Sequence, residues 1–350
     1  MRRAARARHN RSDYRGARAR RAYPPCNYGR VGMLEAAGAA AGVASRFNLD
    51  SLLAGSAVSI PGFRIPIDGM GGGVAKPAEV RFDAADLYGA QGPQAADIRQ
   101  DALGDCYFVA TLGAVARQQP DAIRNMISFD ARTGNFTVQL HDGDGNPQSV
   151  QVTQAELEDN LARSGGSTAD NTGLDGPIWP AVAETAYAKV HDSNPADGLA
   201  EGYNAIANGG WPQDAMQAIT GDRGDEIRYS EGFFESENSA LDRMAGQVDA
   251  ALSNGRPVTL WTVPENRSLW DKIRGNEGTQ DGLVDNHVYT VEGVHKNADG
   301  EWMVSVRNPW STNMNVGEGH DTASATMEVP LRTLVDTGGA EAFTAGPAPR

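Results

Sequence analysis

The sequence predicts an α+β protein whose two subdomains differ in kind and follow one another along the chain. From residue 97 to about 225, apolar residues recur mainly at helical spacing. From about 226 to 340 they alternate mainly at the spacing of strands. A doubly wound sheet would instead alternate strands and helices throughout. We therefore expect a helical subdomain at 97–225 and a strand-rich subdomain at 226–340.

Composition and charge are those of a globular protein with room for two domains. The chain has 350 residues, of which 40% are hydrophobic and 7% aromatic. The formal net charge is −14; residues 1–30 hold ten Arg and one Asp (+9), so the remainder carries −14 − 9 = −23. This acidic remainder argues against nucleic acid as a partner of the core. Without an 18-residue apolar run or a signal peptide, we expect a cytoplasmic or non-classically secreted protein.

Two segments precede the predicted subdomains. Residues 1–32 are rich in Arg and Ala and have little to bury, which indicates a disordered tail; a basic arm for nucleic acid is the alternative. Because the composition changes at Met33, a second hypothesis is that translation starts there. Residues 33–96 are rich in Gly, Ala and Pro, and we interpret them as a mobile leader.

The helical subdomain opens with the element on which the functional prediction depends. A Gly-Asp pair before Cys106 predicts a helix start, and the run to Arg117 is apolar on nearly every side, as in a buried helix. Segments 136–140 and 149–153 alternate as a hairpin, and the turn between them lacks the later acidic ligand of a calcium loop. Further helices are predicted at 122–127, 179–189 and 212–219.

The strand-rich subdomain begins with a predicted helix at 237–252, which Asn254, Gly255 and Pro257 end. Predicted strands follow at 258–263, 287–295 and 302–308.

Cys106 is the candidate nucleophile. At the N-terminus of a helix, the macrodipole stabilises a thiolate and lowers the pKa of the thiol. The chain has one other cysteine, Cys26, and no Cys/His spacing typical of zinc. We therefore expect no disulfide framework, and a free functional thiol at Cys106 is compatible with the sequence.

His287 is the candidate base among six histidines, and the predicted hairpin supplies its partner. A four-residue loop at 296–299 would place His287 directly opposite Asn308, close enough for the amide to orient the ring. A tight turn at Asp299 and Gly300 would instead place Val291 opposite Asn308 and leave His287 about 13 Å away. Both registers are compatible with the sequence.

Five segments in order resemble signature motifs of calpain-type cysteine peptidases, in the papain-like superfamily. Residues 100–107, Q-D-A-L-G-D-C-Y, resemble the family's Q-G-x-L-G-D-C-W. The other four are 179–189, similar to W-x-x-L-L-E-K-A-Y-A-K; 209–210 with 220–221, similar to G-G…T-G; 286–289, similar to G-H-A-Y; and 307–310, similar to R-N-P-W-G. Together they span about residues 97–315.

This resemblance implies a papain-like fold and peptide hydrolysis through a thioester. It makes Cys106 the nucleophile, His287 the general base and acid, and Asn308 the residue that orients His287. It makes Gln100 the side-chain donor of the oxyanion hole, beside the backbone N–H of Cys106. Trp310 would pack near these residues, and the substrate would lie between the subdomains.

The chain departs from the family motifs around these positions. Asp101 and Ser311 stand where the family has glycine, and Tyr107 replaces the usual Trp. Asn286 and Val288 flank the histidine where Gly and Ala are usual.

The resemblance raises the question of whether this chain binds calcium. The chain ends soon after the core, so we expect no EF-hand domains and no calcium control by that route. We expect no required cofactor. Calcium sites known in the cores of some relatives cannot be assigned to residues of this sequence.

The sequence thus predicts a calpain-like cysteine endopeptidase acting on proteins or peptides, with no membrane span. Two alternatives stay open: a non-catalytic papain-like module that binds partners through its cleft, and an acyl transferase that uses the same three residues.

Overall fold

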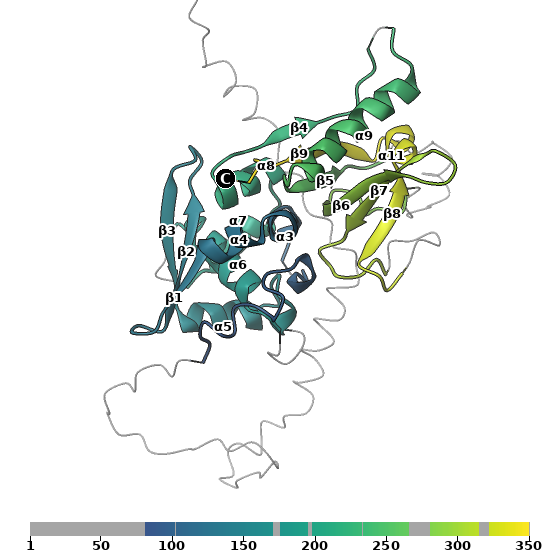
Figure 1. Cartoon of the computed structure of the whole chain (residues 1–350). Coiled ribbons are helices and arrows are strands. Elements are labelled where there is room, and N and C mark those ends of the chain that lie inside the picture. Colours follow the sequence, from purple (N-terminus) through teal and green to yellow (C-terminus); the bar gives the residue numbers. More distant parts are fainter. Residues whose placement is uncertain are drawn as a thin grey trace, which may run out of the picture.

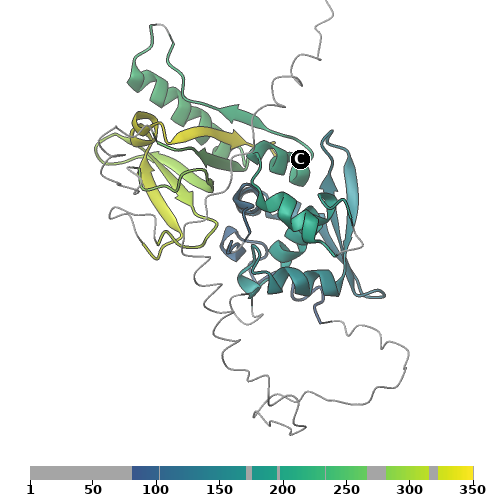
Figure 2. The same ribbon diagram turned by 180° about the vertical axis from the view of Figure 1, so that it is seen from behind.

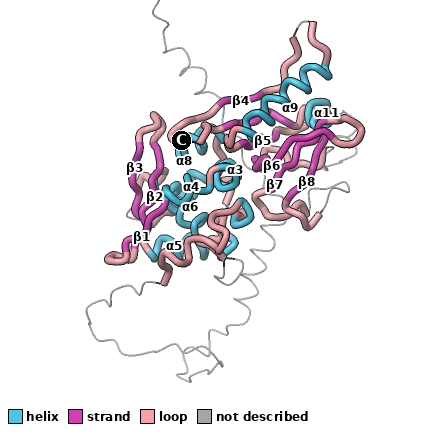
Figure 3. Tube along the Cα trace, viewed as in Figure 1, coloured by secondary structure: helices cyan, strands magenta, loops and turns pink. Residues whose placement is uncertain are grey.

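The computed structural model describes residues 81–101, 103–170, 176–194, 198–232, 234–265, 281–314 and 322–349. The predicted tail at 1–32 and the leader up to residue 80 lie outside the described residues. The described chain is α+β, with helices concentrated in the first part and strands in the second (Figure 3). The predicted fold class is therefore confirmed.

The first part of the described chain combines helices with a small antiparallel sheet in the order β1-β2-β3. Both views place this sheet on the outer side of the helices, away from the second part (Figures 1 and 2). The predicted hairpin and the helices predicted at 106–117, 179–189 and 212–219 are all present. The elements are η2 (Ala95–Asp97), α3 (Cys106–Gln118), α4 (Pro120–Met126), β1 (Ile127–Asp130), β2 (Asn135–His141), β3 (Pro147–Val152), α5 (Gln154–Ala162), η3 (Thr168–Asp170), α6 (Trp179–Val190), α7 (Ala200–Ala207) and α8 (Pro212–Thr220).

Helix α3 lies at the centre of the first part, and its residues are buried from Cys106 to Ala116. The ring of Phe108 stacks on Tyr187 of α6, with centroids 3.9 Å apart and planes 3° apart. A Cβ atom on Gly210 would overlap the ring of Tyr107, so only glycine fits there. Three of the sequence motifs therefore meet at α3: the motif that contains Cys106, the motif in α6 and the glycine pair at 209–210.

The second part is a six-stranded sheet in the order β4-β9-β5-β6-β7-β8, covered by α9 (Figure 1). Leu241, Met244 and Val248 are the buried face of α9, at the spacing expected of an amphipathic helix. The elements are β4 (Asp225–Ile227), α9 (Glu237–Ser253), β5 (Val258–Thr262), β6 (Val288–Lys296), β7 (Trp302–Arg307), β8 (Thr326–Pro330), α11 (Leu331–Thr337) and β9 (Ala340–Ala345).

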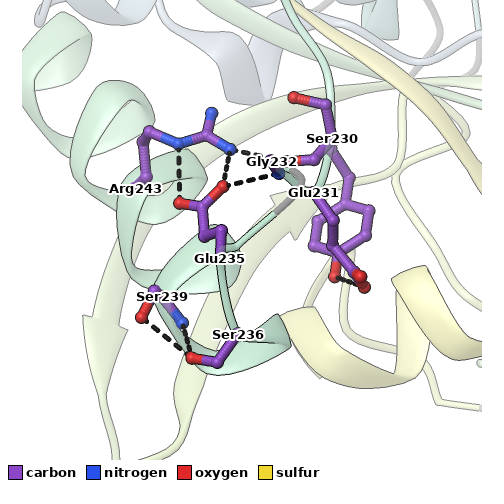
Figure 4. A network of polar contacts seen from close by, with 8 residues as sticks. Ser230, Glu231, Gly232, Glu235, Ser236, Ser239 and Arg243 are labelled. Carbon is purple, nitrogen blue, oxygen red and sulfur yellow. Dashed lines mark hydrogen bonds and ion pairs between the residues drawn. The ribbon is translucent and has the colours of Figure 1, made fainter.

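The start of α9 is held by polar side chains (Figure 4). Ser236 takes the N-cap position, and its Oγ accepts a hydrogen bond from the backbone N–H of Ser239 at 3.2 Å. One turn further on, Arg243 donates to both oxygens of Glu235, at 3.1 and 2.9 Å. The same carboxylate accepts the N–H of Gly232. These contacts explain why the helix begins where the sequence predicts.

The pairing of β6 with β7 differs from both predicted registers. Thr290 pairs with Arg307, whereas Val294 pairs with Val304, so the register shifts by one residue in between. Two features cause the difference: a bulge near Glu292, and a turn in which the Asn297 side chain accepts two backbone N–H groups. Neither of the two registers that the sequence left open is therefore the observed one, and His287 does not lie directly opposite Asn308 in the ladder.

The ends of the folded region also lie elsewhere than the sequence suggests. Residues 81–96, which we assigned to the leader, pack on the first part, where Phe82 and Leu87 are buried. The side chain of Gln154 brackets Phe82 with two hydrogen bonds of 2.9 Å. At the other end, β9 extends past residue 340 and pairs with β5 in the interior of the large sheet.

Candidate active site

The geometry of His287 and Asn308 determines which ring nitrogen of the histidine is available. His287 Nε2 lies 3.0 Å from Asn308 Oδ1. That oxygen also accepts the backbone N–H of Trp310 at 3.0 Å, which identifies it as the oxygen of the amide. Nε2 must therefore carry the proton that it donates to Asn308. The lone pair of the neutral imidazole is then on Nδ1, which is buried and has no hydrogen-bond partner among the described residues.

Asn308 is held in turn by Asn313, a residue that sequence reasoning missed. Asn308 Nδ2 donates to Asn313 Oδ1 at 3.2 Å, and both side chains are fully buried. Asn313 Nδ2 donates to the carbonyls of Ser324 and Ala325, at 2.8 and 3.0 Å. Asn313 thereby fixes the amide that fixes the histidine. A polar residue five positions after Asn308 was the only signal in the sequence.

His287 lies in an apolar and aromatic setting. Its side chain is 1% exposed, and its ring lies 4.7 Å from that of Trp310 and 5.0 Å from that of Tyr289, centroid to centroid. Burial lowers the pKa of His287 to about 4, and the hydrogen bond to Asn308 opposes this shift. The imidazole is therefore neutral at pH 7. The contact with Trp310 agrees with the predicted place of that residue.

Helix α3 and strand β6 run side by side in the same direction. Thr290 Oγ1 donates to the carbonyl of Ala110 at 2.7 Å, and further along both elements Arg117 Nη2 donates to the carbonyl of Glu292 at 3.0 Å. Cys106 precedes Ala110 by one helical turn, about 6 Å. His287 precedes Thr290 by three residues, about 10 Å. The candidate nucleophile and base thus lie toward the same end of the contact between the two parts.

Cys106 is disulfide-bonded in this structure, so the free thiol that the sequence left open is not the state observed. The chain's other cysteine, Cys26, lies outside the described residues. Sequence spacing excludes a framework of several disulfides but cannot exclude one bond, because pairing depends on distance in space. Any nucleophilic role of Cys106 requires prior reduction.

The backbone of Gln100 links the two parts of the molecule: its N–H donates to the carbonyl of Pro309 at 2.8 Å. Its side-chain amide nitrogen donates to the carbonyl of Leu103 at 2.7 Å and to Asp105 Oδ1 at 3.3 Å. Both amide protons are therefore engaged within the loop that leads to Cys106. The predicted oxyanion donor is adjacent to the nucleophile but turned toward its own loop.

Two departures from the family motifs coincide with left-handed backbone. Asn286 has φ of 53° and Ser311 has φ of 57°, a region that favours glycine. The family's glycines at these two positions are therefore explained by backbone conformation. Ser311 Oγ donates to the carbonyl of Ile98 at 2.7 Å, a link between the two parts that glycine could not make.

The part of the chain that the structure describes shows neither a cluster of metal ligands nor a membrane-spanning helix. There, no group of three or more His, Cys, Asp or Glu side chains is arranged to hold a metal ion. None of the described helices combines the length and the apolarity needed to cross a membrane.

The fold and this constellation define the class of a papain-like cysteine protease core. The model of the calpain family cysteine proteases matches residues 75–331, well over half of the chain. The chain therefore belongs to the calpain family.

Individual relatives are distant. A "Thiol protease" of Porphyromonas gingivalis is 24% identical over 235 residues, 63% of this chain and 45% of that protein. The "Calpain-type cysteine protease DEK1" of Arabidopsis thaliana is 28% identical over 224 residues, covering 62% and 9%. "Calpain-13" of Rattus norvegicus is 25% identical over 225 residues, covering 63% and 30%. The chain thus spans less than half the length of each of these relatives.

Proposed function

We propose that this chain is a cysteine endopeptidase that hydrolyses peptide bonds of protein substrates through a thioester on Cys106. The single observation that carries the proposal is the His287–Asn308 pair. Its hydrogen bonds leave a neutral imidazole with the lone pair on Nδ1. The ring lies just before the first residue of β6, toward the N-terminus of α3. A base of this kind is what a thiol needs to become a nucleophile.

In the proposed reaction, His287 Nδ1 takes the proton of the reduced Cys106 thiol. The thiolate attacks the carbonyl carbon of the peptide, a C–S bond forms, and the carbonyl π electrons move to the oxygen. When this intermediate collapses, the C–N bond breaks and His287 gives its proton to the departing amine. Water then attacks the thioester with His287 again as base, which releases the acid and restores the thiol.

The oxyanion formed in each half of the reaction needs hydrogen-bond donors. We assign this role to the backbone N–H of Cys106 and the side-chain amide of Gln100. Because the Gln100 amide donates to Leu103 and Asp105 in the structure, it must turn outward when substrate binds. The chemistry uses side chains and water, so we propose that it requires no metal.

The test is digestion of a protein substrate by wild type and by Cys106→Ala, each with dithiothreitol. We expect Cys106→Ala to abolish hydrolysis and labelling by an epoxide inhibitor, and Cys26→Ala, the matched control, to retain both. Parallel reactions with calcium and with a chelator test the proposed independence from metal. Hydrolysis that survives in Cys106→Ala would reject the mechanism.

Two other functions for the same core give different results in this experiment. A non-catalytic binding module would show equally slow alkylation of Cys106 and Cys26 by iodoacetamide, and no hydrolysis by the reduced wild type. An acyl transferase would form the thioester but pass the acyl group to an added amine in preference to water. Neither function is favoured by a specific contact in the structure.

A further inference from the structure

Two buried carboxyl groups meet directly behind the start of α3. Asp105 precedes Cys106, Glu184 lies in the middle of α6, and both side chains are 0% exposed. Asp105 occupies the N-cap position of α3, but its side chain makes no capping hydrogen bond to the helix. Each carboxyl group instead lies close enough to the other for a hydrogen bond between them to affect the pKa of both.

In each carboxyl group, one oxygen accepts hydrogen bonds from neutral donors. Gln100 Nε2 donates to Asp105 Oδ1 at 3.3 Å. On the other side, Asn160 Nδ2 and the backbone N–H of Gly166 donate to Glu184 Oε2, at 2.5 and 3.2 Å. The other oxygen of each group, Asp105 Oδ2 or Glu184 Oε1, is therefore the one left for a bond between the two groups.

Within the part of the chain that the structure describes, the charged and titratable groups around the pair include no cation. Among the described residues, no Lys, Arg or His acts on either carboxyl group. The titratable groups that face the pair are the phenols of Tyr107 on α3 and Tyr203 on α7, and burial raises the pKa of each further above neutrality. Both phenols are uncharged at physiological pH, so neither can balance a second negative charge.

Without a cation, the two carboxyl groups can lie side by side if one of them is protonated. Asp105 Oδ2 and Glu184 Oε1 are buried, and neither oxygen accepts a hydrogen bond from any donor within the described chain. Two facing carboxylates without a cation repel each other strongly in such a site. One proton between them converts the repulsion into a hydrogen bond. Consistent with this, burial and the neighbouring acid raise the pKa of Glu184 well above its usual value, and burial raises that of Asp105 to about 6.

We propose that Asp105 and Glu184 share one proton at neutral pH and act as positioning residues for the proposed protease site, an inference that rests on the proposed function of Cys106. The shared hydrogen bond ties the residue before Cys106 to α6. The other oxygen of Asp105 holds the amide of Gln100, the proposed oxyanion donor, until that amide turns outward to the substrate. One carboxyl group thereby connects the nucleophile, the oxyanion donor and the centre of the helical part.

Amide substitutions distinguish a shared proton from simple space filling. In Asp105→Asn, the new Nδ2–H donates to ionised Glu184, and Oδ1 still accepts from Gln100. In Glu184→Gln, the new Nε2–H donates to ionised Asp105, and Oε1 accepts from Asn160 and Gly166. Each single variant thus replaces the shared proton. The double variant turns two NH₂ groups toward each other, with no acceptor between them.

The first measurement is a double-mutant cycle in unfolding free energy and in kcat/KM at pH 7, with dithiothreitol. We expect each single variant to keep kcat/KM within about fivefold of wild type, and the double variant to fall at least about tenfold below the product of the two single effects. A double variant that fails to fold while both single variants fold shows the same non-additivity. Additive effects would overturn the proposal.

The second measurement is the pH dependence of unfolding, which does not depend on activity. Acids whose pKa is raised in the folded state stabilise it fully below their unfolded pKa, and this stability is lost as pH rises through about 6. Each single variant should show a smaller loss across this range than wild type. Asp121→Asn, which removes an exposed carboxylate on α4, should keep the wild-type slope. Single variants with the wild-type slope would overturn the shared proton.

The two proposals fail separately. If reduced wild type hydrolyses no peptide while the unfolding cycle is non-additive, the proposed function fails and the shared proton stands. If wild type is active but the cycle is additive, the proton pair fails and the protease assignment stands.

Discussion

At the scale of single residues, the orientation of His287 is fixed by a relay of amides rather than by a charged group. Asn313 holds Asn308, and Asn308 holds Nε2 of the ring. Because no anion contacts the imidazole in this relay, burial dominates and keeps the ring neutral. A neutral ring accepts a proton from a thiol, which is the role that the proposed mechanism assigns to it.

The burial of His287 predicts a dependence of stability on pH. Its folded pKa of about 4 lies below the unfolded value of 6.5, so the unfolded chain binds more protons between these two values. The stability that His287 contributes is present above pH 6.5 and is lost as pH falls through about 4, on the order of 3 kcal/mol in total.

This dependence is measured by urea unfolding of Cys106→Ala, which has no thiolate to interact with the ring, with and without His287→Gln. The difference in unfolding free energy between the two proteins should shrink on going from pH 7 to pH 4.5. The same difference at both pH values would show that the ring is not buried as a neutral group.

At the scale of elements, helix starts in this chain are set by side chains that the sequence displays. Ser236 caps α9, and Thr153 with Glu156 forms a capping box at α5. Strand pairing is different, since one bulge near Glu292 changed the register of the hairpin that carries the candidate base. Local signals therefore predicted where α9 begins, but α5 was not predicted despite its capping box, and the alignment of the two strands was not predicted either.

The cap of α9 gives a prediction at this scale. Ser236→Ala removes the acceptor for the N–H of Ser239 and should lower the unfolding free energy by about 1 kcal/mol. The measurement is chemical denaturation, with Ser236→Asp as the matched variant that restores the acceptor. Peptide hydrolysis should be unaffected, because the first turns of α9 contact the end of β6 that lies away from His287, where Lys296 donates to Asp242 at 3.1 Å. A Ser236→Asp variant as unstable as Ser236→Ala would contradict the capping role.

At the scale of the whole molecule, the site depends on how closely α3 approaches β6. Gly113 makes this approach possible, because a Cβ atom there would lie 2.8 Å from Thr290 Oγ1. The hydroxyl cannot move aside without losing its hydrogen bond to Ala110. The distance between the two parts is thus set by one glycine in a helix, where glycine is otherwise unfavourable.

Gly113→Ala is therefore expected to push α3 away from β6. Overpacking of this kind costs roughly 1–3 kcal/mol in unfolding free energy, and kcat should fall more than KM rises because the nucleophile moves relative to the base. Gly246→Ala on α9 is the control: nothing lies within 4 Å of its Cβ, so it should stabilise by about 0.5–1 kcal/mol. Equal stabilisation by both substitutions would contradict the close approach.

Strand β9 and the packing of residues 81–96 were not predicted from the sequence, because both depend on contacts between residues that are far apart along the chain. Strand β9 pairs with β5, about eighty residues earlier, and the chain then ends beside α8 (Figure 1). Phe82 is buried, and its backbone is bonded to the side chain of Gln154, 72 residues further along the chain. Neither pairing leaves a periodic pattern in the local sequence.

Residue order and local pattern were enough to predict an α+β chain, its main helices, and Cys106, His287, Asn308 and Gln100 as candidates. These follow from side-chain chemistry and from periodicity, which act over a few residues. The register at Glu292, the support of Asn308 by Asn313, the inward turn of Gln100 and the pairing of Asp105 with Glu184 came only from the tertiary structure. Each of these joins residues or backbone segments whose distance and burial are set by the packing of the whole fold, and it is this packing that determines their protonation and orientation.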